Sequence, residues 1–233
     1  MNMKLLITSG GTSEAIDQVR AITNHASGNL GKIIAEQALK RGHEVTLVTT
    51  RQAVKPDSQK NLTIIEITNV DSLKETLEPL VKTHQALIHS MAVSDYTPVY
   101  MAGLDEIRAT EDISSLLKKQ NTESKISSKD NYQVLFLKKT PKVISYVKKW
   151  NPAITLFGFK LLVNVPKVEL FAVARQSIER NGADYILAND LKDIGENQHI
   201  AYLVDKTREI QAQTKDEIAQ LILNTLEKGE QNG

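Results

Sequence analysis

The sequence predicts an α/β protein with a doubly wound, mostly parallel sheet of the Rossmann-like kind. Short apolar runs alternate with helix-period runs along the 233-residue chain, a pattern typical of βαβ units and parallel sheets. Hydrophobic residues make up 41% of the chain, which is enough to bury a core. We find no internal repeat. We therefore expect a single domain over residues 1–233, with helices on both faces of the sheet.

Several apolar runs are predicted to be strands. Each is rich in Val, Ile, Leu or Thr and is bounded by turn residues or by the start of a helix-period run. In chain order they cover residues 3–8, 44–49, 62–68, 86–93, 132–139, 154–159 and 184–190. A β-hairpin over residues 199–213 is predicted to follow them.

Helices are predicted where apolar residues recur at three- and four-residue spacing. In the first, over residues 28–41, Leu30, Ile34 and Ala38 share one face and Gly42 ends the helix. The others cover residues 71–84, 141–149 and 167–181 and the stretch from residue 216 onward. All but the last connect two predicted strands, as crossover connections in a parallel sheet do.

Residues 97–130 interrupt this alternation. They carry little periodicity and many Ser, Lys, Asp and Glu residues, and long stretches of that kind are often active-site lids or disordered segments. We interpret them as a mobile flap or insertion within the domain, with one short helix and poor order without ligand. Beyond the flap, Thr140 is predicted as the N-cap of the next helix and Pro141 as its first residue.

Composition excludes several classes of function. The net charge is +1 and aromatic residues make up 5%, so nothing favours nucleic acid or an anionic membrane as partner. The absence of cysteine removes disulfides, thiolate catalysis and cysteine-ligated zinc. No apolar run approaches the roughly 20 residues of a membrane span, and the amino terminus lacks a signal-peptide core. We expect a cytoplasmic protein, most often an enzyme.

Glycines lie at the end of the first strand and at the start of the first helix. Gly10 and Gly11 follow the strand, whereas Ser27 and Gly28 open the helix after a loop. A dinucleotide-binding fingerprint would place its glycines within one tight turn, so the fit to it is poor. At the start of a helix, a glycine such as Gly28 has no side chain to cover the backbone N–H groups, and such exposed N–H groups are suited to binding phosphate. The alternative, that Ser27 only caps the helix and the glycines only pack, stays open at this point.

The loop between the glycines carries further polar residues. Arg20 could bind an anionic substrate group or form a surface ion pair. Asn24 could be functional or could satisfy the backbone of a turn. His25, a single histidine beside an asparagine, is more often structural than catalytic.

A longer pattern joins these residues. The stretch SGGTSEAIDQVRAITNHASGNLGKIIA resembles the opening of the phosphopantothenoylcysteine synthetase family, the phosphopantothenate–cysteine ligases of coenzyme A synthesis. The family pattern is GGT followed by ID.VR.I.N.SSG..G, and here Ala26 stands where the first serine is usual. The later segments MAVSDY, SKISSKD, LKKTPKVI, GFKLL and DYILAND resemble family segments in the same order. The resemblance covers essentially residues 4–205.

Other positions depart from the family pattern. The flap motif KIKK is thinned, with Lys125 kept and Lys129 displaced. Lys142 replaces an acidic residue, and Ser177 and Asn181 fall where CTP-using relatives often carry lysines. The segment GFKLL is instead of the type found in ATP-using relatives. We favour CTP as the nucleotide, as in most bacterial relatives, and leave ATP open.

The resemblance implies a two-step ligation. The carboxylate of 4′-phosphopantothenate attacks the α-phosphate of a nucleoside triphosphate, accompanied by Mg²⁺, and pyrophosphate leaves. The amine of cysteine then attacks the acyl-nucleotide and releases the nucleoside monophosphate. In many bacteria this domain is fused to a flavin-dependent decarboxylase, for which 233 residues leave no room. The resemblance therefore implies a stand-alone ligase without flavin, and a homodimer with its active site near the subunit boundary.

The resemblance also assigns roles to individual residues. Asn24 matches the catalytic asparagine that holds the acyl-nucleotide carbonyl, Lys125 matches the catalytic lysine of the flap, and Arg20 is a candidate for anionic groups of the substrate. The residues expected to bind the nucleotide are Gly10, Gly11, Thr12, Ser27, Gly28, His89, Ser90, Met91, Asp95, Lys125, Pro141, Lys142, Val143, Ile144 and Phe159. The resemblance does not identify metal ligands.

Plain structural roles stay open for several of these residues. Lys125 could be a solvated lysine, Asp95 a turn residue and Phe159 a core side chain. Two other functions also remain. A short-chain NAD(P)-dependent oxidoreductase would need a TGxxxGxG turn and a YxxxK pair, but Trp150 stands four residues after Tyr146. A non-catalytic nucleotide-binding module would bind without turnover.

Overall fold

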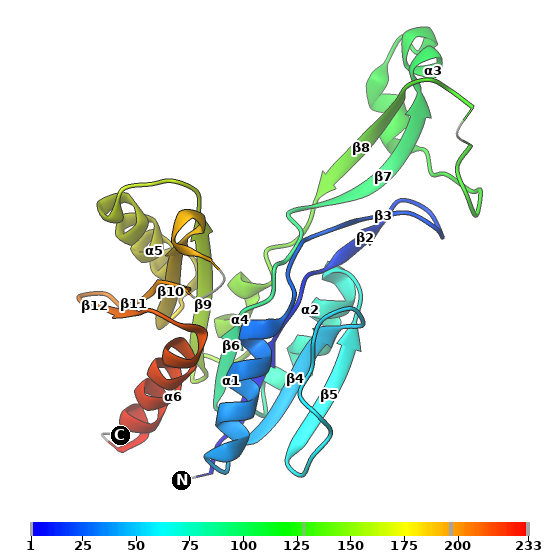
Figure 1. Cartoon of the computed structure of the whole chain (residues 1–233). Helices are drawn as coiled ribbons and strands as arrows, with labels where there is room; N and C mark the ends of the chain where they lie inside the picture. The colour runs from blue at the N-terminus through cyan, green and yellow to red at the C-terminus, as the bar shows by residue number, and fades with distance from the viewer. Residues whose placement is uncertain (1, 128, 196–197, 232–233) are drawn as a thin grey trace.

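The computed structural model describes residues 2–127, 129–195 and 198–231, whose path is traced in Figure 1. Its centre is an eight-stranded sheet, which confirms the predicted α/β class. The strand order is β12 (Glu209–Ala212), β11 (Ala201–Val204), β10 (Tyr185–Asp190), β9 (Thr155–Leu162), β6 (Ala86–His89), β1 (Lys4–Thr8), β4 (Glu44–Thr50) and β5 (Leu62–Ile67). Neighbours from β10 to β5 are parallel, whereas β11 and β12 form the predicted antiparallel hairpin.

Helices cover both faces of the sheet, as predicted. One face carries α1 (Asn29–Lys40) and α6 (Lys215–Gln231), and the other carries α2 (Val70–Val81), α4 (Ile144–Trp150) and α5 (Lys167–Asn181). Successive strand residues point to opposite faces, so Leu5 and Ile7 of β1 pack on the α1 side and Leu6 on the α2 side. Across the described ranges, no helix combines the length and apolar character that a membrane span needs.

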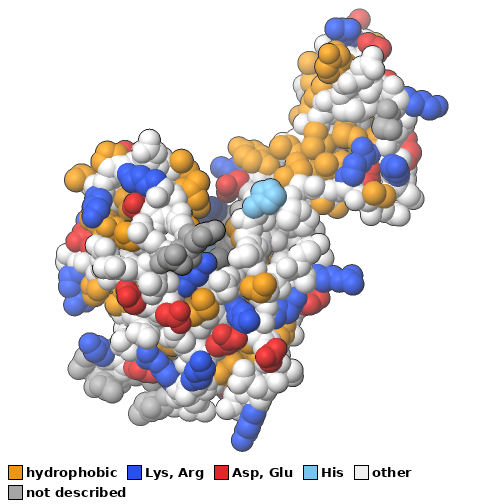
Figure 2. Space-filling model, viewed as in Figure 1, with side chains coloured by type: hydrophobic (Ala, Val, Ile, Leu, Met, Phe, Trp, Pro, Cys, Tyr) orange, Lys and Arg blue, Asp and Glu red, His pale blue; other side chains and the backbone are white. Residues whose placement is uncertain are grey.

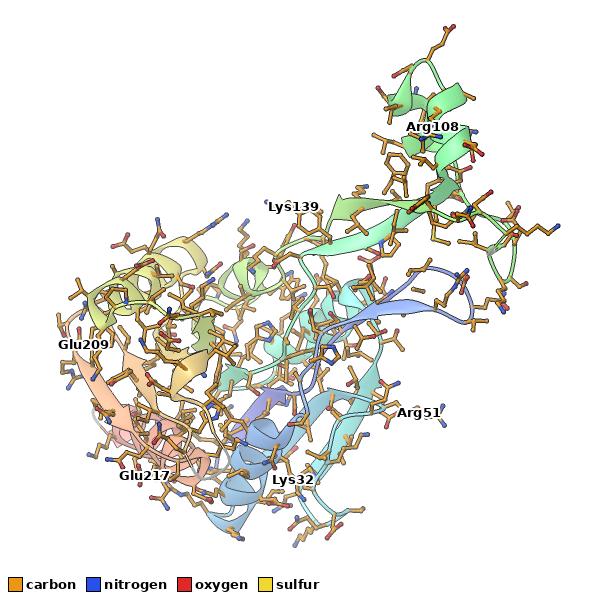
Figure 3. All side chains as sticks on the ribbon, turned by 45° about the horizontal axis from the view of Figure 1, so that its top comes forward. Lys32, Arg51, Arg108, Lys139, Glu209 and Glu217 are labelled. Carbon is orange, nitrogen blue, oxygen red and sulfur yellow. The ribbon has the colours of Figure 1, made fainter. Side chains whose placement is uncertain are left out.

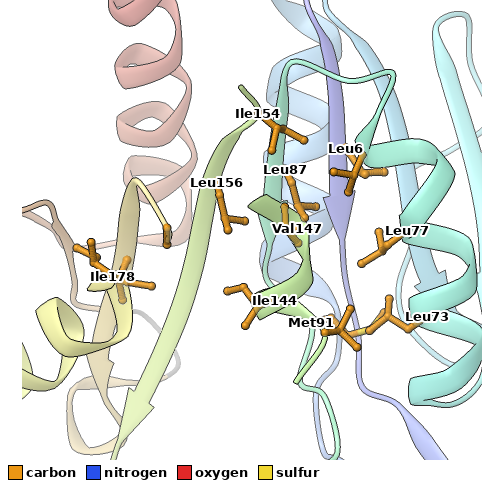
Figure 4. Close-up of a cluster of buried hydrophobic side chains, with 14 of the residues drawn as sticks. Leu6, Leu73, Leu77, Leu87, Met91, Ile144, Val147, Ile154, Leu156 and Ile178 are labelled. Carbon is orange, nitrogen blue, oxygen red and sulfur yellow. The ribbon is translucent and has the colours of Figure 1, made fainter. Parts of the chain in front are cut away.

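The core cluster under α2, α4 and α5 extends to the end of β6. Figure 4 shows Leu6 and Leu87 of the sheet among side chains from α2 and α4, with Met91 and Ile144 at the border of the group. Met91 and Ile144 are 6% and 9% exposed. Because protein cores are packed as densely as organic crystals, this cluster holds both residues in place beside the cavity described below.

The strand order reverses between β1 and β6. From β1 the sheet extends through β4 and β5 on one side, and through β6, β9 and β10 on the other. Thr8 ends β1, His89 ends β6, and the two are paired neighbours. In open α/β sheets, ligands bind outside the carboxyl ends of the strands at such a switch point. The polar residues that follow Thr8 and His89 therefore lie where a ligand site is expected.

Residues 97–130 are more regular than predicted. β7 (Tyr96–Gly103) and β8 (Gln133–Lys139) form an antiparallel ribbon, and α3 (Leu104–Ala109) and the 3-10 helix η1 (Ile113–Lys118) follow β7. The prediction of one short helix without a strand was wrong, because the register shift between Pro98 and Tyr100 breaks the strand period. Figure 1 shows this ribbon and its helices projecting from the body; residues 96–139 are called the arm below.

The arm also contains the predicted strand over residues 132–139, which we had expected in the main sheet. A second small hairpin was missed: β2 (Ser13–Ala15) pairs with β3 (Ala21–Thr23), and β2 contacts β7 of the arm. Strands of three residues are too short to show a period. Together the arm and this hairpin extend the chain beyond the carboxyl ends of the main sheet (Figure 1).

The predicted cap of α1 was wrong. Gly28, not Ser27, is the N-cap residue, and it has a left-handed backbone with φ of 80°. The Ser27 hydroxyl instead accepts a hydrogen bond from the Asn29 N–H at 3.3 Å. The chain must turn sharply here to bring the helix start close to the loop after β1, and glycine adopts that conformation without strain.

The predicted start of α4 was also wrong. The helix begins at Ile144, three residues after Pro141. The Thr140 hydroxyl donates to the Ser94 carbonyl oxygen at 2.6 Å, and the Thr140 N–H donates to the Asp95 carbonyl oxygen at 3.0 Å. Thr140 therefore ties the end of β8 to the start of β7 and is not free to cap a helix.

Candidate functional site

The loops that follow β1 and β6 are hydrogen-bonded to each other. The Ala92 N–H donates to the Gly10 carbonyl oxygen at 2.9 Å, and the Thr12 N–H donates to the Ala92 carbonyl oxygen at 3.0 Å. The Thr12 hydroxyl lies 2.9 Å from the Ser94 hydroxyl and accepts from the Ser94 N–H at 2.9 Å. The strand ends at His89, but these bonds keep its continuation fixed beside the first loop.

Asn24 packs directly against these two loops. Its N–H donates to the Thr12 carbonyl oxygen at 3.2 Å. Its side-chain Nδ2 lies 3.3 Å from the Ala92 carbonyl oxygen and 3.4 Å from the Ser94 hydroxyl. A Cβ atom at Gly11 would lie 2.4 Å from the Asn24 carbonyl oxygen. Only glycine permits this close approach, so the predicted GGT turn serves to position Asn24.

The start of α1 completes this platform. The Ser9 hydroxyl donates to the Gly28 carbonyl oxygen at 3.0 Å, which holds the helix start against the loop after β1. A Cβ at Gly28 would lie 2.9 Å from both the Ser9 hydroxyl and the Ala53 Cβ. No acidic residue stands in the first turn of α1. The free N–H groups of a helix start attract anions, and nothing in that first turn opposes this.

A cavity of about 540 Å³ opens beside the platform. Its wall comes from the start of α1, the end of β6, the turn before α4, the end of β9 and the inner side of α5. The predicted nucleotide-binding residues in this wall are His89, Ser90, Met91, Lys142, Val143, Ile144 and Phe159. A second hollow of about 650 Å³, between α5 and the β11–β12 turn, contains none of the predicted residues.

The cavity wall carries positive charge. Lys142, Lys160 and Arg180 contribute to it, and none of the described aspartates or glutamates does. Lys142 lies 3.4 Å from the exposed carboxylate of Asp95, an ion pair worth little in water. A wall of this composition is suited to an anionic ligand. Within the described residues, no group of three or more His, Asp or Glu side chains could hold a metal ion.

His89 contributes a neutral imidazole to the wall. Its Nδ1 lies 2.8 Å from the Thr8 hydroxyl, and that hydroxyl also accepts from the Met91 N–H at 3.3 Å. In the tautomer in which the Thr8 hydroxyl donates to Nδ1, the ring proton is on Nε2. Burial, and secondarily the charge of Lys142, lowers the pKa of His89 to about 4. In that tautomer the ring, which is neutral at neutral pH, can donate one hydrogen bond to a ligand.

This pKa predicts a loss of stability on mild acidification. An unfolded histidine titrates near 6.5 and folded His89 near 4, so between these values the unfolded chain binds more protons. The free energy of unfolding should fall as the pH drops through this window, by up to about 1.4 kcal/mol per pH unit from this group. The pKa values of His84 and His199 are also lowered, mainly by burial, and act in the same direction.

Urea unfolding at pH 6.5 and pH 5.0 measures this loss, before most carboxylates titrate. His89→Asn keeps an acceptor for the Thr8 hydroxyl but does not titrate. Its stability should change less with pH than that of the natural chain. An equal dependence in both proteins would contradict the assignment to His89.

Several predicted residues lie beside the cavity and not in its wall. Gly10, Gly11 and Thr12 form the interlocked loops, and Thr12 has no exposed surface. Ser27 and Gly28 form the start of α1. Asn24 immediately precedes His25 and Ala26, which do line the cavity. Asp95 and Pro141 lie at the junction of the arm with the body, where Asp95 reaches Lys142.

Arg20 and Lys125 lie elsewhere. Arg20 is at the tip of the β2–β3 hairpin, and Lys125 is in the arm beside that tip. In Figure 3, Arg108 marks the far end of the arm and Lys139 its junction with the body, with the hairpin running along the arm. Neither Arg20 nor Lys125 lines the cavity of the same chain. Within one chain, the predicted site therefore falls into two separate groups.

Sequence reasoning missed part of the cavity wall. Lys160, Arg180, Asn189 and His199 line it but were not predicted. Lys160 stands in the strand β9, and Arg180 near the end of α5. The positive charge of both residues, in elements close to the switch point, is a sequence feature that favours a place in an anion-binding wall. That feature identifies the two residues only when the packing of α5 against the sheet is known.

Comparison with known proteins gives the chain its context. The family model described as the DNA/pantothenate metabolism flavoprotein C-terminal domain matches residues 1–119 and 109–229. The crystal structure of the DNA/pantothenate metabolism flavoprotein from Streptococcus pneumoniae is 56% identical, with a TM-score of 0.93 over 97% of this chain and 99% of that chain. A Cab2 variant in complex with phosphopantothenate-cysteine shares the fold alone, at 17% identity and a TM-score of 0.73, over 97% of this chain and 87% of that chain.

Curated relatives agree with these matches. The coenzyme A biosynthesis bifunctional protein CoaBC of Thermococcus kodakarensis is 34% identical over 229 residues, which is 97% of this chain and 51% of that protein. The chain thus spans about half the length of the curated relatives it matches.

Proposed function

Because the chain belongs to the DNA/pantothenate metabolism flavoprotein C-terminal domain family, we propose that it joins 4′-phosphopantothenate to cysteine in coenzyme A biosynthesis. The single observation that carries this proposal is that Asn24 lies beside a cation-lined cavity at the sheet's switch point, with its side chain in contact with Ala92 of the cavity wall. The motifs that resemble phosphopantothenoylcysteine synthetases support it. So does the 34% identity to a coenzyme A biosynthesis protein. A cytoplasmic location remains a prediction.

The first half-reaction needs a bound triphosphate. A carboxylate oxygen of phosphopantothenate attacks the α-phosphorus, the bond to the bridging oxygen breaks, and pyrophosphate leaves with the negative charge. Lys142, Lys160 and Arg180 can balance that charge, as can the start of α1. The His89 ring can donate a neutral hydrogen bond beside them. Mg²⁺ would enter with the triphosphate.

The second half-reaction consumes the acyl-nucleotide. The cysteine amine attacks the acyl carbon, the acyl–phosphate bond breaks, and the nucleoside monophosphate leaves as the amide forms. The Asn24 side chain can donate to the acyl oxygen without a charge of its own. Its long contacts of 3.3 and 3.4 Å to the Ala92 carbonyl and the Ser94 hydroxyl are easily exchanged for a better acceptor.

CTP is the nucleotide we propose, with ATP as the alternative. Ser177 and Asn181, at positions where CTP-using relatives often carry lysines, line the cavity without charge. Lys142 and Arg180 line the same cavity, so the wall is cationic despite those replacements. Charge balance therefore does not argue against CTP in this chain.

We also propose that the chain works as a homodimer joined through its arms. An isolated two-stranded ribbon is marginally stable in water, yet β7 and β8 pair only with each other among the described residues. The arm exposes large apolar side chains, including Tyr96, Tyr132 and Leu137 at 52%, 71% and 45%. Figure 2 shows hydrophobic side chains gathered along the arm. A second copy could cover them and bring its Lys125 to this chain's cavity.

Pyrophosphate release tests the proposed function. The purified chain is supplied with CTP, ATP, GTP or UTP and Mg²⁺, and phosphopantothenate and cysteine are omitted in turn. We expect sustained release with CTP and both acceptors present, and at most one equivalent per site without cysteine. A higher kcat/KM with ATP would reverse the choice of nucleotide. Tight nucleotide binding without release under any condition would instead indicate a non-catalytic module.

A further inference from the structure

The tip of the β2–β3 hairpin is hydrogen-bonded to residues 124–126 of the arm, and these contacts are called the grip below. Asp17 Oδ2 accepts from the Ile126 N–H at 3.1 Å, and Arg20 Nη2 donates to the Ile126 carbonyl oxygen at 2.8 Å. The Gln18 N–H donates to the Ser124 carbonyl oxygen at 3.1 Å. The backbone of the residues on both sides of Lys125 is therefore bonded to the hairpin tip.

Within the described residues, this segment makes few other hydrogen bonds to the rest of the chain. The connection between η1 and β8 contains no helix or strand in its described part. Asn121 anchors its beginning, where Oδ1 accepts from the Met101 N–H at 2.8 Å and Nδ2 donates to the Met101 carbonyl oxygen at 3.0 Å. The Ile126 side chain is 7% exposed. Among the described residues, the hydrogen bonds to the hairpin tip and the burial of the Ile126 side chain together fix the backbone position of Lys125.

The grip depends on one ion pair. Asp17 Oδ2 accepts from Arg20 Nε at 3.0 Å and from Nη2 at 2.5 Å, and the Asp17 side chain is 1% exposed. The Arg20 guanidinium and the surrounding N–H groups hold the pKa of Asp17 well below its usual value. Because a depressed carboxylate pKa keeps the group ionised above that value, the pair stays formed throughout the neutral range.

A second turn in the same chain shows what this ion pair does beyond shaping its own hairpin. Asp205 and Arg208 form the same D-x-x-R pair in the β11–β12 turn, with Nε and Nη2 of the arginine 3.1 and 3.0 Å from Oδ2. There the aspartate side chain is 19% exposed and the arginine 72%. Within the described chain, neither side chain makes a hydrogen bond outside its turn. A D-x-x-R turn can therefore form with both side chains partly exposed. The burial of the Asp17 carboxylate comes instead from its contacts with the arm.

We propose that Asp17 and Arg20 are positioning residues that hold Lys125 for catalysis. This inference rests on the proposed ligase function, in which Lys125 would meet the negative charge that develops on the leaving pyrophosphate. Lys125 itself is exposed and has no ion-pair partner among the described residues, so its amine is free to meet that charge. Fixing the backbone on both sides removes motion that the reaction would otherwise have to overcome.

Trypsin provides a test that does not depend on activity. Asp17→Asn should raise the rate of cleavage after Lys125, followed site by site by mass spectrometry, by at least about tenfold. Asp205→Asn, which breaks the same pair in the other turn, should leave that rate unchanged. Arg20→Lys keeps the positive charge but cannot donate from two nitrogens as Arg20 does, so this variant should also raise the rate of cleavage after Lys125. Cleavage after Lys125 at the natural rate in both hairpin variants would overturn the proposal.

Kinetics then connect the grip to Lys125. Asp17→Asn should lower kcat by about tenfold and change each KM by less than about twofold. In a Lys125→Gln background the same substitution should lower kcat no further, because the two residues act through one effect. Additive losses would show that Asp17 acts elsewhere and would overturn the proposal. A natural chain without ligase activity would instead refute the proposed function, while the trypsin result would still report on the grip.

Discussion

Asn24→Asp is expected to form the acyl-nucleotide but to convert it to product on the order of 100-fold more slowly than the natural chain. The substitution keeps the shape of the side chain and replaces an amide donor with a negative acceptor. In the structure, Nδ2 of Asn24 faces the Ala92 carbonyl oxygen at 3.3 Å. A carboxylate there would meet another acceptor, and it would repel the phosphate of the intermediate as well.

Rapid quench with labelled phosphopantothenate separates the two half-reactions. The intermediate should accumulate in Asn24→Asp and product should appear slowly. Asn24→Ala, which removes the amide without adding charge, should lose the same step. Ser94→Ala is the matched control, since it removes a neighbour of the amide at 3.4 Å but leaves Asn24 in place; its product rate should stay within a few-fold of the natural chain.

The opposite result is also informative. Asn24 is held by the Thr12 carbonyl oxygen and by close packing on Gly11, and neither contact involves its side chain beyond Cβ. The fold and nucleotide binding should therefore survive the substitution. If they do, and no intermediate forms, then Asn24 is needed for activation of the carboxylate and our assignment is wrong.

The sheet could be predicted because its signals are local. A strand such as β4 is a short continuous run of apolar and threonine residues, and a helix such as α5 shows its own period. The glycines around Asn24 mark a close approach that only glycine allows. The arm could not be predicted in the same way. Within the described chain its strands pair only with each other, Pro98 interrupts one of them, and both lie on the surface with mixed burial.

The cavity could be predicted only in part, for a similar reason. The residues after β6 lie in one short run, so a motif could identify them. Arg180 reaches the same wall from α5, and only the packing of that helix against the sheet decides which of its side chains face the cavity. Thr140 shows the converse: an apparent helix cap serves instead as a tertiary contact to Ser94.

Lys125 lies in the arm, apart from the cavity of its own chain, and its substitution is expected to have a large effect on the first half-reaction. Lys125→Gln should lower the rate of pyrophosphate release by on the order of 100-fold, because a cation that meets the charge on the leaving pyrophosphate is lost. The acyl-nucleotide should then fail to form, in contrast to Asn24→Asp. Nucleotide binding at equilibrium should change much less, since Lys142, Lys160 and Arg180 remain in the cavity wall.

Mixing two inactive chains decides whether Lys125 acts on its own cavity or on that of a second copy. Asn24→Ala and Lys125→Gln chains are combined, dissociated and reassociated. If the arm serves the partner, each mixed dimer carries one site with both residues intact. Random pairing makes about half of the dimers mixed, so activity should return to about a quarter of the natural value. If the arm serves its own chain, every site keeps one defect and no activity returns.

Dimer formation itself is the control for this experiment. Sedimentation should give a dimer for the natural chain and for both variants, because neither residue belongs to the exposed apolar set that includes Tyr96, Tyr132 and Leu137. If the variants form dimers but no activity returns, Lys125 does not act on the cavity of the partner. Lys125 would then act on the cavity of its own chain, and the arm would have to move toward that cavity. A monomer that is fully active at micromolar concentration would contradict the proposed assembly. In that case the apolar face of the arm would need another explanation.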